Sequence, residues 1–107
     1  MLYELRTYDT VPGKLPALLE RFEKGVVHFF DKHGIGMLGF WTDEVGVSNR
    51  LTYIVTAENM GDREAKWDAL QADPEWQRVR SESETNGPLV ARITNSLLTP
   101  TDYSPMQ

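Results

Sequence analysis

The sequence predicts one α+β domain with the element order strand, helix, strand, strand, helix, strand. Short segments rich in β-branched and aromatic residues alternate with two longer segments whose apolar residues recur every three or four positions. Proline and glycine residues with turn-forming character separate these segments. The length of 107 residues suits a single compact domain.

Four segments have the composition of strands: Leu2–Tyr8, Gly36–Asp43, Arg50–Ala57 and Leu89–Leu98. The first segment alternates, so that Glu4, Arg6 and Tyr8 lie on one face. A short connection containing Gly46 joins the second and third segments, which predicts an antiparallel pair.

Two helical segments complete the domain. The first is predicted from about Leu15 to Lys32, because its apolar stripe is nearly continuous and Gly34 follows as a C-terminal glycine. The second, Asn59–Arg80, is predicted to break at Asp73-Pro74, because the aspartate can cap a new helix and proline suits its first turn. This order is the ferredoxin-like arrangement, a four-stranded antiparallel sheet with the helices on one face.

The second face of such a sheet has no cover. It would carry Phe40 or Trp41, Tyr53 or Ile54, and apolar residues of the last strand. That is more apolar surface than a solvated face normally exposes. We therefore expect a two-fold homodimer whose sheets face each other as a barrel. Residues 99–107 are expected to form an extended tail.

Composition disfavours several functions. The net charge is −5 and the basic residues are scattered, which disfavours nucleic acids and anionic membrane surfaces as partners. The absence of cysteine excludes disulfides, thiolate metal sites and cysteine nucleophiles. No signal peptide or membrane span is recognised, so a cytoplasmic location is expected by default. Without a phosphate loop, nucleophile elbow or zinc-helix motif, we expect no cofactor and no metal.

Glu4, Arg6 and Tyr8 are the main candidates for a functional site, because two opposite charges and a phenol rarely share a strand face. We expect them to point into the space between the two sheets. Arg6 could hold a carboxylate or phenolate ligand, and Glu4 could act as a general base if burial raises its pKa. The alternative is an internal Glu4–Arg6 ion pair that fixes the sheet register or the dimer.

Three further residues are candidates for a site. His33 is a catalytic candidate because histidine titrates near neutral pH, but it and His28 diverge around the helix and cannot bind one metal together. Trp41 and Tyr53 are candidates for ligand binding, although large aromatic residues more often belong to cores and interfaces.

Several motifs follow one another along nearly the whole chain: Tyr3-Glu4-Leu5-Arg6-Thr7-Tyr8, Pro12-Gly13-Lys14, His33-Gly34, Gly39-Phe40-Trp41, Asp62-Arg63-Glu64, Asp73-Pro74-Glu75-Trp76 and Thr101-Asp102-Tyr103-Ser104-Pro105. In this combination the chain resembles the NIPSNAP family, a branch of the dimeric α/β-barrel superfamily. The resemblance implies the ferredoxin-like fold and the dimeric barrel. It implies no established reaction.

Three hypotheses for function follow. The first is a homodimeric protein that binds a small apolar or aromatic ligand between sheet and helices. The second is a cofactor-independent monooxygenase or isomerase, which rests on analogy with other dimeric α/β barrels. The third is a structural or interaction module. A deep pocket with convergent polar groups would favour the first two over the third.

Overall fold

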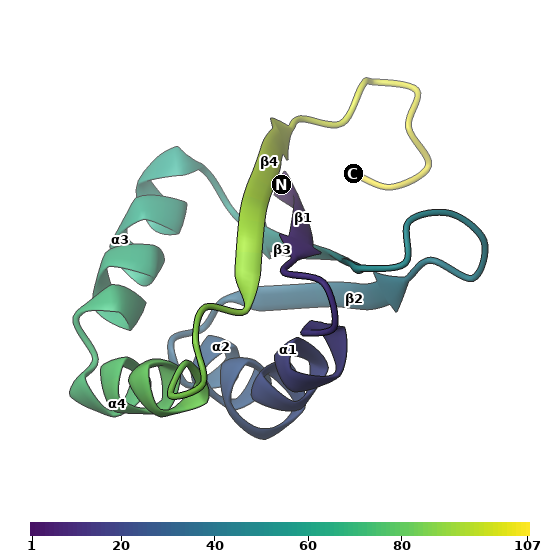
Figure 1. Ribbon diagram of the computed structural model, residues 1–107. Helices are drawn as coiled ribbons and strands as arrows, with labels where there is room; N and C mark the ends of the chain where they lie inside the picture. The colour runs from purple at the N-terminus through teal and green to yellow at the C-terminus, as the bar shows by residue number, and fades with distance from the viewer.

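The computed structural model describes residues 1–107 and has the predicted ferredoxin-like architecture (Figure 1). Four antiparallel strands form one sheet in the order β2-β3-β1-β4. The elements are β1 (Leu2–Thr10), α1 (Leu15–Arg21), η1 (Phe22–Val26), α2 (Val27–Lys32), β2 (Gly36–Thr42), β3 (Arg50–Ala57), α3 (Met60–Gln71), α4 (Pro74–Ser83) and β4 (Val90–Leu98).

The first helical segment differs from the prediction at its centre, where η1 is a turn of π-helix between α1 and α2. A period of three to four apolar residues does not distinguish such a turn from α-helix. Gly25 in η1 packs closely against α4, because a Cβ atom there would lie 3.0 Å from Cγ1 of Val79. The segment ends as predicted at Gly34, whose φ of +71° is accessible to glycine without strain.

The break in the second helical segment is confirmed. The Asn59 side chain accepts a hydrogen bond from the Asp62 N–H (2.9 Å) at the start of α3. Asp73 accepts one from the Glu75 N–H (3.0 Å), and Pro74 is the first residue of α4. The two caps allow α3 and α4 to run in clearly different directions (Figure 1).

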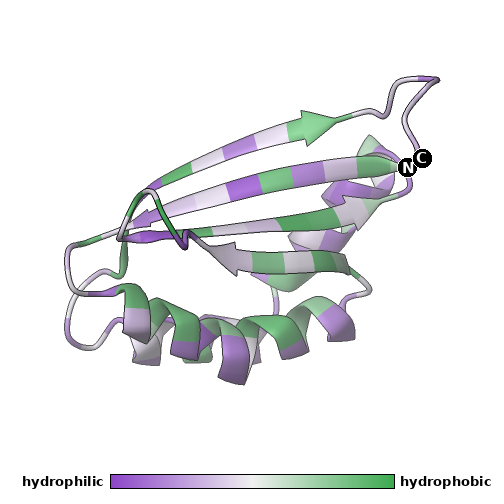
Figure 2. Ribbon diagram, turned by 90° about the vertical axis from the view of Figure 1, so that its right-hand side faces the viewer, coloured by the Kyte–Doolittle hydropathy of each residue, from purple (hydrophilic) through white to green (hydrophobic).

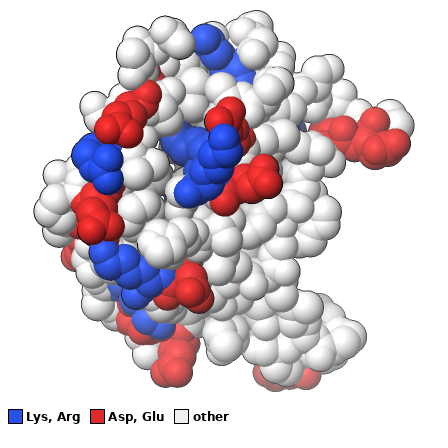
Figure 3. All heavy atoms as spheres, turned by 90° about the horizontal axis from the view of Figure 1, so that it is seen from below, with Lys and Arg blue, Asp and Glu red and all other residues white.

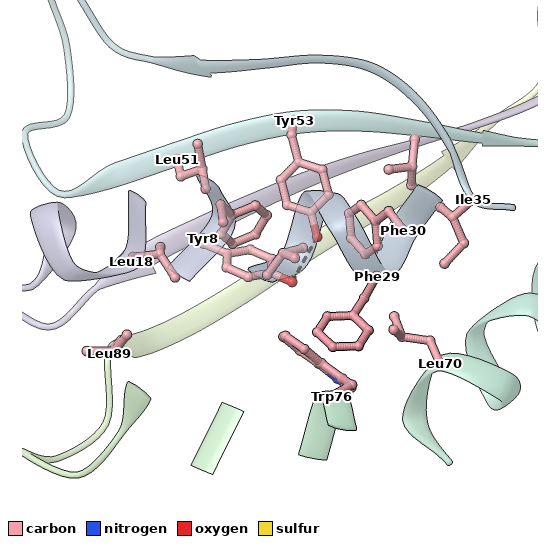
Figure 4. Close-up of a cluster of buried hydrophobic side chains, with 13 residues drawn as sticks. Tyr8, Leu18, Phe29, Phe30, Ile35, Leu51, Tyr53, Leu70, Trp76 and Leu89 are labelled. Carbon is pink, nitrogen blue, oxygen red and sulfur yellow. Dashed lines mark hydrogen bonds between the residues drawn. The ribbon is translucent and has the colours of Figure 1, made fainter. Parts of the chain in front are cut away.

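The hydrophobic core lies between the sheet and the helices (Figure 4). Its centre is Tyr53, which is fully buried and packs against Phe22 and Phe40 with ring centroids 5.2 and 5.3 Å away. The sequence left open which residue of each pair, Phe40 or Trp41 and Tyr53 or Ile54, lies on the uncovered face of the sheet. In the structure Phe40 and Tyr53 face the helices, whereas Trp41 and Ile54 lie on the opposite face.

The outer face of the sheet has no helix over it (Figure 2). It carries Tyr3, Leu5, Trp41, Ile54 and Leu98, and Trp41 is 51% exposed. The Trp41 indole folds over Gly39, where a Cβ atom would lie 2.5 Å from the ring. The sheet is open in the single chain, so the barrel dimer stays a prediction.

The helices do not cover β4. Every residue of this edge strand except Val90 is exposed, including Ile93 and Leu97 on the face directed at the helical layer. Figure 2 shows β4 as the strand farthest from the helices below the sheet. The exposure of Ile93 and Leu97 shows that the side of β4 facing the helical layer is open to solvent.

The C-terminal tail contains neither helix nor strand, but it turns back on itself instead of extending (Figure 1). The Gln107 side-chain amide donates to the carbonyl oxygens of Thr101 and Ser104 at 2.9 and 2.6 Å, which holds the turn. Separately, none of the helices combines the length and apolar character needed to cross a bilayer.

Candidate functional site

The polar side chains of β1, those of Glu4, Arg6 and Tyr8, lie on the face of the sheet that the helices cover. Glu4 accepts a hydrogen bond from Arg63 of α3, and the Arg6 guanidinium lies 4.6 Å from the ring centroid of Trp67 in the same helix. The expectation that these residues face a space between two sheets is therefore wrong. A period of two shows which residues share a face, but it does not show which face the helices cover.

Glu4 is almost completely buried and is surrounded by donors. Its carboxylate accepts hydrogen bonds from Arg6 (2.6 Å), Arg63 (2.7 Å) and Asn95 (3.2 Å). Burial alone would raise the pKa of Glu4, but the hydrogen bonds from Arg63, Asn95 and Arg6 outweigh it and lower the pKa to about 2. Glu4 is thus ionised at neutral pH, and a general base with a raised pKa is the wrong description of it.

Arg6 joins this carboxylate to two phenols. Its Nε donates to the Tyr53 hydroxyl at 2.7 Å, its Nη1 donates to Glu4, and its Nη2 donates to the Tyr8 hydroxyl at 3.1 Å. The internal Glu4–Arg6 pair, which was the structural alternative, is present in the fold. It is extended by Arg63, because two guanidinium groups share the one carboxylate.

The two phenols lie 2.9 Å apart, hydroxyl to hydroxyl (dashed line in Figure 4). Burial raises the pKa of Tyr53 well above its usual value, so its hydroxyl keeps its proton. Each hydroxyl accepts a bond from Arg6, and only one of the two hydroxyl protons can serve the bond between them. When Tyr53 donates to Tyr8, the remaining O–H is that of Tyr8, which lines the adjoining cavity; Tyr53 is fully buried and does not line it.

A cavity of about 470 Å³ lies between the sheet and the helices, next to this network. Ten of its sixteen lining residues are hydrophobic, and they include Phe22, Val26, Phe30, Trp67, Trp76 and Ile93. Arg6 and Tyr8 form part of the wall. A cavity of this size and composition is typical of small-molecule sites.

Two buried N–H groups of cavity-lining residues have no hydrogen-bond partner in the protein: Nε1 of Trp76 and Nε of Arg21. The Nη1 of Arg21 is partnered, because it donates to Ser83 (3.3 Å) and to the carboxylate of Glu84 (3.2 Å). Both atoms are closed off from solvent, and therefore also from the open cavity, so they are not placed to bond a molecule that enters it.

The structure brings together Glu4, Arg6, Tyr8 and Tyr53, but it separates the other two candidates from them. Trp41 lies on the outer face of the sheet. His33 lies at the end of α2, with Nε2 2.8 Å from the Asp73 carboxylate, and does not line the cavity. Lys32 and His33 hydrogen-bond to Asp73 and hold its pKa well below the usual value, so this cluster ties α2 to the cap of α4.

Sequence reasoning missed three members of the site: Arg63, Trp67 and Asn95. Neither Arg63 nor Trp67 was among the candidates taken from the sequence. They lie four residues apart in α3, a spacing that places side chains on one helix face and could have paired them. Asn95 carries no local signal, because only the pairing of β4 with β1 places it opposite Arg6. No group of three or more metal-ligating side chains is present.

The fold defines the class of protein. The chain is a ferredoxin-like α+β domain that shares its fold with a putative antibiotic biosynthesis monooxygenase from Nitrosomonas europaea (TM-score 0.65, 9% identity, covering 94% of this chain and 98% of that one). At that identity the likeness concerns the fold alone.

The particular family is shown by the sequence. The NIPSNAP family model matches residues 3–105, and the chain belongs to the NIPSNAP family. It is similar to Atu4242 from Agrobacterium tumefaciens (27% identity, TM-score 0.88, all of both chains covered). It is also similar to an uncharacterised NIPSNAP domain protein from Burkholderia xenovorans (26% identity, TM-score 0.85, 98% and 99% covered). Among curated proteins, none matches the chain.

Proposed function

We propose that this NIPSNAP-family protein is a homodimer that binds a small apolar or aromatic molecule between the helices and the sheet. The observation that carries the proposal is the 470 Å³ cavity with its mostly apolar wall. Arg6 and Tyr8 supply polar groups at one point of that wall and would orient the bound molecule.

The cavity is open to solvent, and it leaves Ile93 half exposed although Ile93 faces the helical layer. Filling the cavity with an apolar ligand would remove such surface from water, at about 25 cal/mol for each Å² of apolar area. The gain favours a bound molecule over an empty cavity.

Filling the cavity with a side chain should prevent binding. We expect Ile93→Trp to weaken the binding of naphthamide, a neutral aromatic amide, by about tenfold or more, because the indole would occupy the ligand's volume. Glu82→Trp is the control, because it places the same indole on the exposed side of α4. Isothermal titration calorimetry measures both. Equal affinities for the two variants would overturn the cavity as the binding site.

The homodimer is supported by the apolar outer face of the sheet, which nothing in the chain covers (Figure 2). A second copy would bury Trp41, Ile54 and their neighbours in a self-complementary interface. We expect sedimentation equilibrium at micromolar concentration to give twice the 12.2 kDa mass of the chain. A clean monomer under those conditions would contradict the barrel. Ile54→Glu should shift the protein to the monomer, because it places a charge in the interface.

A cofactor-independent monooxygenase or isomerase is the second candidate. The Tyr8 hydroxyl favours it, because a donor fixed at the cavity wall could stabilise a developing oxyanion. Glu4 argues against it as the base, since three donors hold that carboxylate ionised. A binding protein that performs no reaction therefore fits the hydrogen bonds of Glu4 better than an enzyme that uses Glu4 as its base. A purely structural module would leave the cavity without a role.

A further inference from the structure

The charges around the cavity indicate the class of ligand, an inference that rests on the proposed function. We propose that the ligand is an amphipathic acid, with an apolar body inside the cavity and an anionic group bound by Arg80. The proposal goes beyond ligand binding because it assigns the charge of the ligand and the residue that recognises it.

The wall carries one uncompensated positive charge. Three guanidinium groups, those of Arg6, Arg21 and Arg80, belong to lining residues. Glu4 pairs with Arg6 and Glu84 pairs with Arg21, which leaves Arg80 without a carboxylate partner. The chain as a whole has a net charge of −5, and acidic and basic side chains are interspersed over the surface shown in Figure 3. The uncompensated charge at the cavity is therefore a local feature that opposes the overall charge, and it attracts anions.

Arg92 also borders the cavity, but its guanidinium group is not one of the positive charges that face the cavity. The register places Arg92 opposite Asp9, and Asp9 lies on the outer face of β1 because its neighbour Tyr8 faces the helices. Arg92 thus borders the cavity, but its strand position directs its side chain to the outer face of the sheet.

Only one of the three guanidinium groups is free to bind a ligand's charge. Arg6 is engaged by Glu4 and two phenols, and Arg21 by Glu84 and Ser83. The Arg80 guanidinium, by contrast, forms no ion pair and no hydrogen bond within the protein; only the Arg80 backbone carbonyl is engaged by a side chain, accepting a hydrogen bond from the Ser83 hydroxyl at 2.7 Å. An uncompensated guanidinium beside an apolar cavity can pair with a carboxylate in bidentate geometry.

The position of Arg80 fits an amphipathic ligand. Arg80 lies one helical turn after Trp76 on α4, and both side chains line the cavity. Trp76 is buried and packs against Phe29, whereas Arg80 is exposed. The apolar end of the wall is thus internal and the charged end is at the surface, as an acid with an apolar body requires.

The test compares a matched pair of probes, naphthoate and its neutral isostere naphthamide, by isothermal titration calorimetry. Naphthoate should bind wild-type protein about tenfold more tightly than naphthamide, as expected for one charge-assisted contact at a partly hydrated site. Arg80→Gln should abolish that preference, so that the two probes bind the variant with equal affinity. Arg78→Gln is the control, because Arg78 lies on the exposed side of α4 beside Glu82, and it should retain the preference.

The outcomes separate the two proposals. If both probes bind wild-type protein equally, or if the preference for naphthoate survives Arg80→Gln, the assignment of an acid bound by Arg80 is overturned while ligand binding stands. If neither probe binds, ligand binding itself fails and the assignment fails with it. A preference that is lost in Arg80→Gln and kept in Arg78→Gln supports both.

Discussion

Replacing Arg6 with methionine is expected to lower the free energy of unfolding by about 3 kcal/mol, the lower end of the loss typical when one partner of a buried ion pair is removed. The substitution leaves the buried Glu4 carboxylate without one donor and takes the shared donor from the Tyr8 and Tyr53 hydroxyls. The loss should lie at the lower end because Arg63 and Asn95 still reach the carboxylate. Chemical denaturation followed by circular dichroism measures it.

Two further variants show whether the loss comes from the buried charge. The double change Glu4→Gln with Arg6→Met should recover much of it, because glutamine carries no charge that requires a partner. Arg50→Met removes the partner of Asp9 in a pair that is 34% and 26% exposed, and it should cost clearly less than Arg6→Met, because water screens an exposed pair. If Arg6→Met costs no more than Arg50→Met, the buried network does not stabilise the fold.

The second large effect is the pH dependence that Glu4 confers. Its pKa is lowered from 4.5 to about 2 in the folded protein. A carboxyl with a depressed folded-state pKa stabilises the protein fully above its unfolded pKa, and the stabilisation is lost as the pH falls toward the folded value. The shift corresponds to about 2–3 kcal/mol, after allowance for the water that reaches Arg63, which is 21% exposed.

Glu4→Gln isolates this contribution from the other carboxyl groups. The difference in unfolding free energy between wild-type protein and Glu4→Gln should be constant above about pH 4.5 and should shrink as the pH falls to about 2. Urea titrations at a series of pH values measure the difference. A gap that stays constant through this range would show that Glu4 is not the ionised centre of the network.

Much of the fold could be predicted because its signals are local. The Asp73-Pro74 break follows from the chemistry of two adjacent residues, and the order of strands and helices follows from periodicity. The π-helical turn could not be predicted in this way, because Phe22–Val26 keeps the apolar spacing of an α-helix. Its position is a property of how the helix packs on α4, where Gly25 meets Val79.

The site was predicted in part for the same reason. Glu4, Arg6 and Tyr8 lie on one strand, so alternation grouped them correctly. Their orientation depended on which face the helices cover, and that is decided by the whole core. Arg63 is far from Glu4 in the sequence, and Arg80 becomes part of the cavity only because the fold places α4 across the cavity from β4. Contacts of this kind have no signature in a single sequence.

The location of the ligand is the central claim, and the indole signals of the three tryptophans test it most directly. Trp67 and Trp76 line the cavity, whereas Trp41 lies on the outer face of the sheet. In a two-dimensional ¹⁵N–¹H spectrum, with signals assigned from Trp→Phe variants, naphthamide should shift the Nε1–H signals of Trp67 and Trp76 and leave that of Trp41 in place. A titration that moves Trp41 and leaves the other two unchanged would place the ligand between the sheets and contradict the account.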